Sequence, residues 1–221
     1  MKRLRLALAG LVAAACWACS PPKYVTYKSI HGDWSALVPY AWDIMTDEEG
    51  LAFTSTNFIG PFDPEFYLGA PSISVRWHAY KKTHRMRDGL VEYYRDVDDY
   101  IDQMLKGVYG PDYHIVDEEN PSREASIGDV KVDGRPAKHF TVLSAAPVDS
   151  KTQWGTSVEP SSGRLVNVRL HEYLIVPLKN GFYVIVYPAT LRGFKFYKPQ
   201  FNAFVHGFKV IGEGPVAQAR P

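Results

Sequence analysis

The sequence predicts one α+β domain, and three observations lead to that prediction. The chain has 221 residues, which is enough for one domain or two small ones. Apolar residues make up 46% and charged residues 22%, as in ordinary globular proteins, so disorder and fibrous repeats are excluded. Runs rich in branched and aromatic residues follow one another along the chain, whereas two segments have the spacing of amphipathic helices.

Charge and cysteine content narrow the class of function. Lys and Arg total 25 and Asp and Glu total 24, so the net charge of +1 is no electrostatic signature of nucleic-acid binding. Aromatic residues reach 14%, which favours strands and a well-filled core. The two cysteines, Cys16 and Cys19, lie three residues apart near the start, so no disulfide framework is available.

The first twenty residues have the organisation of an export signal. A basic stretch at 2–5 precedes the apolar run 6–15, which is too short to span about 30 Å of hydrocarbon as a helix. The small residues Ala13 and Ala15 place signal cleavage directly before Cys16. We therefore expect residues 1–15 to be a signal peptide.

A cysteine at this position resembles the bacterial lipoprotein box. The resemblance implies that the thiol of Cys16 carries diacylglycerol and that the new N-terminus carries a fatty acid such as palmitate. Cys19 is the alternative attachment site, and a plain secretory signal with two incidental cysteines is the other interpretation. Trp17, rather than Asp, follows Cys16, which in this class implies the outer membrane, facing the periplasm.

The remainder divides into a tether at 16–28, a folded domain at 29–211 and a loose tail at 212–221. Within 31–50, two short apolar pieces are separated by Pro39.

The next elements follow from hydrophobic periodicity. Residues 51–58 and 73–81 alternate as strands, and the Pro- and Gly-rich stretch 59–71 between them is an expected loop. From 86 to 108, apolar residues recur every three or four positions, which predicts a long amphipathic helix.

The second half of the chain is expected to be mostly strands. Runs at 113–119, 126–145, 164–178 and 181–189 are rich in branched and aromatic residues, and a long polar loop is expected at 147–163. Tight hairpin turns are predicted at Asp133-Gly134 and Asn180-Gly181. Aromatic residues at helical spacing between 201 and 208 predict a second helix that closes the domain.

The order of these elements resembles the PsbP-like superfamily, and most closely its bacterial DcrB-like lipoprotein branch. The segments that carry the resemblance are DWSALVPYAWDI, VDGRPAKHF and GFYVIVYPA. The resemblance implies an α+β fold in which an antiparallel β-sheet is sandwiched by helices (an α/β/α sandwich), and members that are generally not enzymes. Those members have unrelated roles, including photosystem assembly and binding of small GTPases, so no functional residue is transferred.

Motifs for catalysis and metal binding are not evident in the sequence. The segment HEYLI, which begins at His171, lacks the second histidine of a zinc-protease helix and lies in an expected strand. No G-x-S-x-G elbow is present, and the aspartates at 96–102 lack the glycine and closing glutamate of a calcium loop. We expect no catalytic residue, no metal and no cofactor.

Two polar and aromatic rows are the candidate binding residues. Alternation places Arg76, His78 and Tyr80 on one side of their strand, and it does the same for Arg169, His171 and Tyr173. The rows are either the solvent side of the sheet or a basic and aromatic patch. If their strands are neighbours, Arg76 and Arg169 come close enough to hold an anion between them.

These observations favour a lipid-anchored binding or scaffolding protein of the cell envelope, without catalytic activity. Its partners would be the membrane, reached through the lipid, and an envelope protein or small ligand; nucleic acid is not expected. The alternatives are an envelope hydrolase with an unrecognised site and a structural subunit of an envelope complex.

Overall fold

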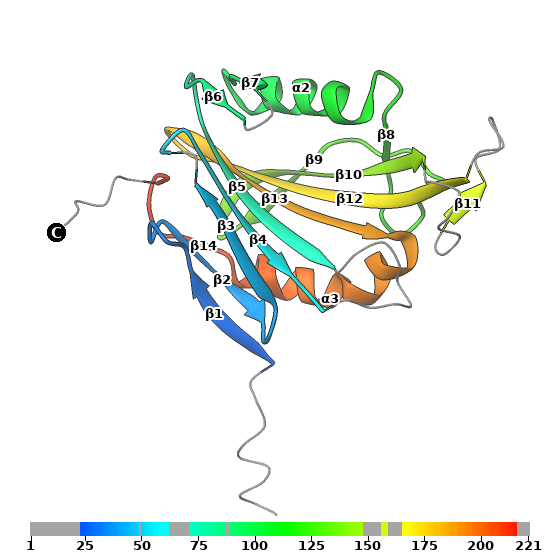
Figure 1. Ribbon diagram of the computed structural model, residues 1–221, viewed down its shortest axis with the longest axis horizontal. Coiled ribbons are helices and arrows are strands. Elements are labelled where there is room, and N and C mark those ends of the chain that lie inside the picture. Colours follow the sequence, from blue (N-terminus) through cyan, green and yellow to red (C-terminus); the bar gives the residue numbers. More distant parts are fainter. Residues whose placement is uncertain are drawn as a thin grey trace, which may run out of the picture.

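A nine-stranded antiparallel sheet forms the middle layer of the computed structural model, which describes residues 23–48, 50–61, 71–86, 89–147, 156–158 and 165–215 (Figure 1). Its main path runs in the order β3 (Asp43–Glu48), β4 (Phe53–Ile59), β5 (Ser72–Ala79), β13 (Gly181–Thr190), β12 (Leu165–Pro177), β10 (Arg135–Pro147) and β8 (His114–Val116). Strand β9 (Gly128–Val132) pairs with β10, and β11 (Thr156–Val158) pairs with β12.

Strand β13 lies at the centre of the sheet, and both of its faces are covered by a hydrophobic cluster. Phe182 and Val184 belong to the cluster beneath helix α2, whereas Tyr183 and Ile185 belong to the cluster on the opposite face. A strand that is covered on both faces has a continuous run of apolar residues instead of alternating apolar and polar residues.

Helix α2 (Val97–Tyr109) covers one face of the sheet (Figure 1). It begins at residue 97, not at 86 as predicted. The Asp96 carboxylate caps it by accepting from the backbone N–H of Asp99 at 2.8 Å. The preceding residues instead form a small hairpin of β6 (His84–Arg85) and β7 (Val91–Glu92), so apolar spacing alone overextended the helix.

The opposite face is covered by helix α3 (Leu191–Gly207) and by a three-stranded sheet (Figure 1). That sheet has the order β1 (Tyr24–Lys28), β2 (Trp34–Pro39) and β14 (Lys209–Val210). The second expected helix and the sandwich architecture are therefore confirmed. No helix in the described ranges has both the length and the apolar character that crossing a bilayer requires.

Both ends of the domain extend further than the sequence suggested. Residues Tyr24–Lys28 were expected in the tether but pair with β2 along their whole length. Residues 212–215 were expected in the loose tail, yet the Gly212 N–H donates to the Asp33 carbonyl and Gly214 is buried. Residues 1–22, 62–70 and 216–221 lie outside the described part of the chain.

The predicted turn at Asp133-Gly134 is confirmed. Val132 pairs with Arg135, and both intervening residues, Asp133 and Gly134, have positive φ, as a two-residue hairpin turn requires. The chain also reverses near Asn180, but the central residues of that turn are Lys179 and Asn180: the N–H of Leu178 donates to the carbonyl of Gly181, which is already the first residue of β13. Neither Asn180 nor Gly181 has positive φ, so the turn lies one residue earlier than predicted.

Candidate binding sites

The structure places all six candidate residues from the two rows on the sheet face that α2 covers, but their strands are not neighbours. Strand β13 separates β5 from β12: Arg76 pairs with Val184 on one side of it, and Arg169 pairs with Thr190 on the other. The two arginine backbones are thus about 20 Å apart along the strand direction alone. The idea that one anion sits directly between adjacent guanidiniums is therefore wrong.

His78 belongs to the core rather than to a binding surface. Its side chain is 4% exposed and stacks on Phe182 at 5.3 Å between ring centroids. Burial lowers the pKa of His78 to about 3, with smaller contributions from the charges of Arg76 and His84. The Glu92 carboxylate, 3.6 Å from Nδ1, does not offset that burial, so the imidazole is neutral.

His171 and Tyr173 form a hydrogen-bonded cluster with Tyr109 of α2. The Tyr109 hydroxyl lies 2.6 Å from that of Tyr173 and also contacts Nδ1 of His171. Burial, with the nearby charges of Arg169 and Arg76, lowers the pKa of His171 to about 4. The cluster attaches the end of α2 to the sheet.

The two arginines lack carboxylate partners among the described residues. Arg76 is exposed, and Arg169 is half-buried with its Nε hydrogen unpaired; the Nε2 atom of His171 is also unpaired. Burial lowers the pKa of Arg169. The two arginines therefore carry positive charges that no carboxylate among the described residues compensates directly.

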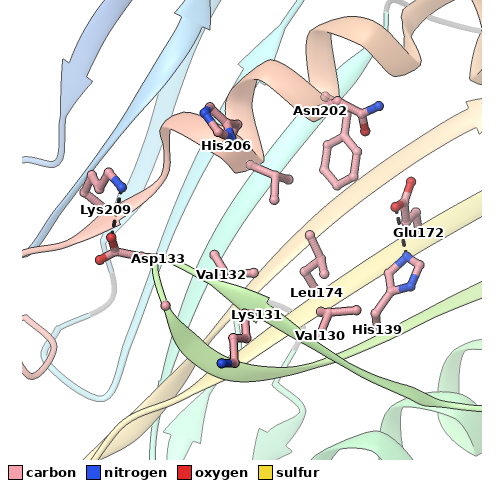
Figure 2. Close-up of a pocket in the computed structure, with 13 residues that line it drawn as sticks. Val130, Lys131, Val132, Asp133, His139, Glu172, Leu174, Asn202, His206 and Lys209 are labelled. Atoms are coloured by element: carbon pink, nitrogen blue, oxygen red, sulfur yellow. Dashed lines mark hydrogen bonds and ion pairs between the residues drawn. The ribbon is translucent and has the colours of Figure 1, made fainter.

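A cavity of about 680 Å³ lies on the opposite side of the sheet, between α3 and the β9–β10 hairpin (Figure 2). We call it the α3 cavity. Its apolar surface consists of Val130, Val132, Leu174, Phe201 and Val205. Figure 2 shows Glu172 and His139 at one end and the Asp133–Lys209 ion pair at the other, with Val132 and Leu174 between them.

A charged cluster forms the Glu172 end of the cavity. Glu172 is 3% exposed; it lies 3.0 Å from Nε2 of His139 and accepts from the Lys198 ammonium at 2.5 Å. Lys198 also contacts the carboxylate of Glu118. Two carboxylates therefore share one ammonium group, which leaves negative charge beside the cavity.

Within the described ranges, the same cluster includes the three residues best placed to hold a metal ion. Oxygen or nitrogen atoms of Glu118, His139 and Glu172 lie within 4.8 Å of one another. The Lys198 ammonium contacts both carboxylates and so supplies the cation of this cluster. HEYLI itself lies in β12, and the alternation of that strand directs His171 and Glu172 to opposite faces.

Sequence reasoning missed this cavity, although one signal was present. Glu172 is an acidic residue within the otherwise apolar second half of β12, and a charge in such a strand is rarely buried without partners. Its partners Lys198 and His139 come from α3 and β10, and Lys198 also contacts Glu118 from the turn after β8. Local sequence patterns do not connect those segments.

The architecture defines this chain as a protein of the PsbP-like α+β fold. No family model and no curated protein matches the sequence. Solved structures do resemble the fold, at sequence identities that establish the fold alone.

Cyanobacterial PsbP (CyanoP) from Synechocystis superposes with a TM-score of 0.50 at 11% identity, covering 87% of this chain and 95% of that chain. The Ran-binding protein Mog1p of Saccharomyces cerevisiae superposes with a TM-score of 0.47 at 8% identity, and the match covers 86% of this chain and 96% of Mog1p. A Pseudomonas aeruginosa protein of unknown function superposes with a TM-score of 0.40 at 10% identity, and the match covers 82% of this chain and 92% of that protein.

Proposed function

We propose that this chain is a non-catalytic binding protein anchored by lipid to the bacterial cell envelope, and that its ligand occupies the α3 cavity. The observation that carries the binding role is the cavity itself. Its volume of about 680 Å³ is in the range of small-molecule sites, and an apolar surface leads to a charged end, the usual composition of such sites.

The charges at the two ends indicate the chemical class of the ligand. At the Glu172 end, Glu172 and Glu118 outnumber Lys198. Away from that end, Asp133 and Lys209 neutralise each other at 3.1 Å, and the exposed Lys131 adds one positive charge. Each carboxylate oxygen has two acceptor sites, so Glu172 retains capacity for a further donor. The cavity therefore suits an apolar molecule that carries an amine.

Three ligands with matched hydrocarbon parts test this proposal. We expect 2-phenylethylamine to bind more tightly than 2-phenylethanol, and 3-phenylpropionate not to bind, because only the amine compensates the excess carboxylate charge. Titration calorimetry at low ionic strength measures all three. The variant Val205→Trp fills the cavity and should abolish binding of the amine, whereas Val108→Trp, on an exposed position of α2, should not.

Two arginines on the α2 face, Arg76 and Arg169, which are unpaired among the described residues, provide the competing outcome. If 3-phenylpropionate binds instead, and if Arg76→Ala or Arg169→Ala weakens that binding while Val205→Trp does not, the ligand lies on the α2 face. That result would contradict the proposed site in the α3 cavity.

The proposal of an envelope anchor rests on the N-terminal sequence and on its resemblance to DcrB-like lipoproteins. Residues 17–23 separate Cys16 from β1, and a fully extended chain of that length reaches about 25 Å. An acyl chain on Cys16 would thus keep the domain close to the bilayer, and the residue after it, Trp17, favours the outer membrane.

Mass spectrometry of protein extracted from membranes tests the anchor. We expect an N-terminus at Cys16 that carries a diacylglycerol and a fatty acyl group, and we expect Cys16→Ser to move the protein to the soluble fraction. Cys19→Ser is the matched control and should leave the protein in the membrane. An unmodified N-terminus at another residue would contradict the proposal.

A further inference from the structure

A second cavity, of about 510 Å³, lies at the end of the sheet where β5 ends and β12 turns into β13. We call it the turn cavity. Backbone hydrogen bonds hold its walls together: the Tyr80 N–H donates to the Asn180 carbonyl, and the Lys81 N–H donates to the Tyr94 carbonyl. The segment 213–215 forms another wall.

The residues that line the turn cavity carry an excess of positive charge. Lys81, Lys82 and Lys179 are all exposed lining residues, and Glu213 is the one carboxylate among the described residues lining it. A fourth cation, Arg95, is already paired with Asp99 at 2.8 Å. Three ammonium groups therefore face a single carboxylate.

Trp77, a buried residue whose indole donor has no acceptor in the described part of the chain, also lines this cavity. Trp77 is 2% exposed, and its indole N–H has no hydrogen-bond partner among the described residues. A buried N–H that lacks an acceptor is costly, so its presence beside a cationic cavity points to an acceptor supplied by a ligand. Segment 213–215 lies against the ring: a Cβ on Gly214 would come within 2.3 Å of it.

We propose that the turn cavity binds the phosphate group of a small organic phosphate. Lysine ammonium groups bind phosphate as point charges, and a phosphate near its dianionic form compensates three of them better than a carboxylate does. One phosphate oxygen accepts from the Trp77 indole, and the ring of Tyr80 borders the organic part. Burial, with smaller contributions from the charges of Asp96 and Asp98, raises the pKa of the Tyr80 hydroxyl. Because those carboxylates repel an anion, we place the phosphate at the lysine side of the cavity.

Nuclear magnetic resonance of the purified full chain tests this site through the Trp77 indole N–H. Adding inorganic phosphate or phenyl phosphate is expected to shift that resonance saturably, and the variant Trp77→Phe identifies it by its loss. The indole resonance of Trp34, in β2, is the internal reference and should not move.

Charge variants distinguish binding from general ionic effects. Lys82→Gln and Lys179→Gln should each weaken phenyl phosphate binding by about threefold to fivefold, the usual range for one solvent-exposed charge. Lys28→Gln removes an exposed lysine of β1 that lines neither cavity and should leave the affinity unchanged. Benzoate is the carboxylate ligand for comparison and should bind more weakly than phenyl phosphate.

Vesicles separate the two sources of a phosphate group. If the protein binds phosphatidylglycerol vesicles but not phosphatidylcholine vesicles, with loss in Lys82→Gln and Lys179→Gln, the phosphate belongs to a lipid headgroup; if free phenyl phosphate binds with the same losses, it belongs to a soluble ligand. An unshifted Trp77 resonance, affinity that is insensitive to both lysine variants, or benzoate binding as tight as that of phenyl phosphate would overturn the proposal.

Discussion

Replacing Lys198 by methionine is expected to lower the free energy of unfolding by about 3 kcal/mol, because removing one partner of a buried ion pair leaves an uncompensated buried charge. The side chain of Glu172 is 5% exposed, and Lys198 is its cationic partner at 2.5 Å. Without the ammonium, Glu172 and Glu118 also repel each other, and only His139 still contacts Glu172. Urea denaturation at pH 7 measures the loss.

The double variant Glu172→Leu/Lys198→Met is the control for this interpretation. Replacing both charges by apolar side chains removes the need for compensation, and such replacements are often neutral or stabilising. We therefore expect the double variant to recover most of the stability lost in Lys198→Met. If it is as unstable as the single variant, Lys198 acts through its cation–π contacts with Phe194 and Phe201 rather than through the ion pair with Glu172.

Acidification from pH 7 to pH 4.5 is expected to destabilise the fold through His78 by about 2.5 kcal/mol. The pKa of His78 is lowered from 6.5 to about 3 in the folded state, chiefly by burial. Below pH 6.5 the unfolded chain therefore binds a proton that the folded chain does not accept until about pH 3. The contribution of neutral His78 to the free energy of unfolding is therefore fully present above pH 6.5. It is lost progressively as the pH falls from 6.5 towards 3.

The variant His78→Phe isolates this contribution. The imidazole lies among aromatic rings, with Phe182 at 5.3 Å and Tyr100 at 5.2 Å, so phenylalanine keeps the packing without a titrating group. Chemical denaturation of both proteins at several pH values gives the difference. Parallel stability curves for wild type and variant would show that His78 is not the source of acid sensitivity.

Much of the architecture follows from local pattern. The hairpin turn at Asp133-Gly134 was predictable because an Asp-Gly dipeptide tolerates the positive φ that this turn needs. The turn near Asn180 was predicted one residue too late, because its central residues are Lys179 and Asn180. The strand 73–81 was predictable because its alternation spans a buried and a polar side. The start of α2 was not: apolar residues between 86 and 97 continue the helical spacing by coincidence, and the Asp96 cap determines where the helix begins.

For the candidate binding residues too, the sequence determined some features and the tertiary structure determined others. The sequence by itself determined which side of its strand each residue of the two rows occupies, because side-chain direction in a strand has a period of two. Only the tertiary structure showed that β13 lies between β5 and β12, which separates Arg76 from Arg169, and that His78 is buried under α2.

The α3 cavity and the turn cavity depend on tertiary structure to a still greater extent. Glu172 meets Lys198 and Glu118 only after β12, α3 and the turn beyond β8 come together. Likewise, Trp77 meets Lys179 only where β5 ends beside the β12–β13 turn. Periodicity and turn chemistry act over a few residues, whereas these contacts join segments far apart in the chain, so strand order and helix packing alone decide them.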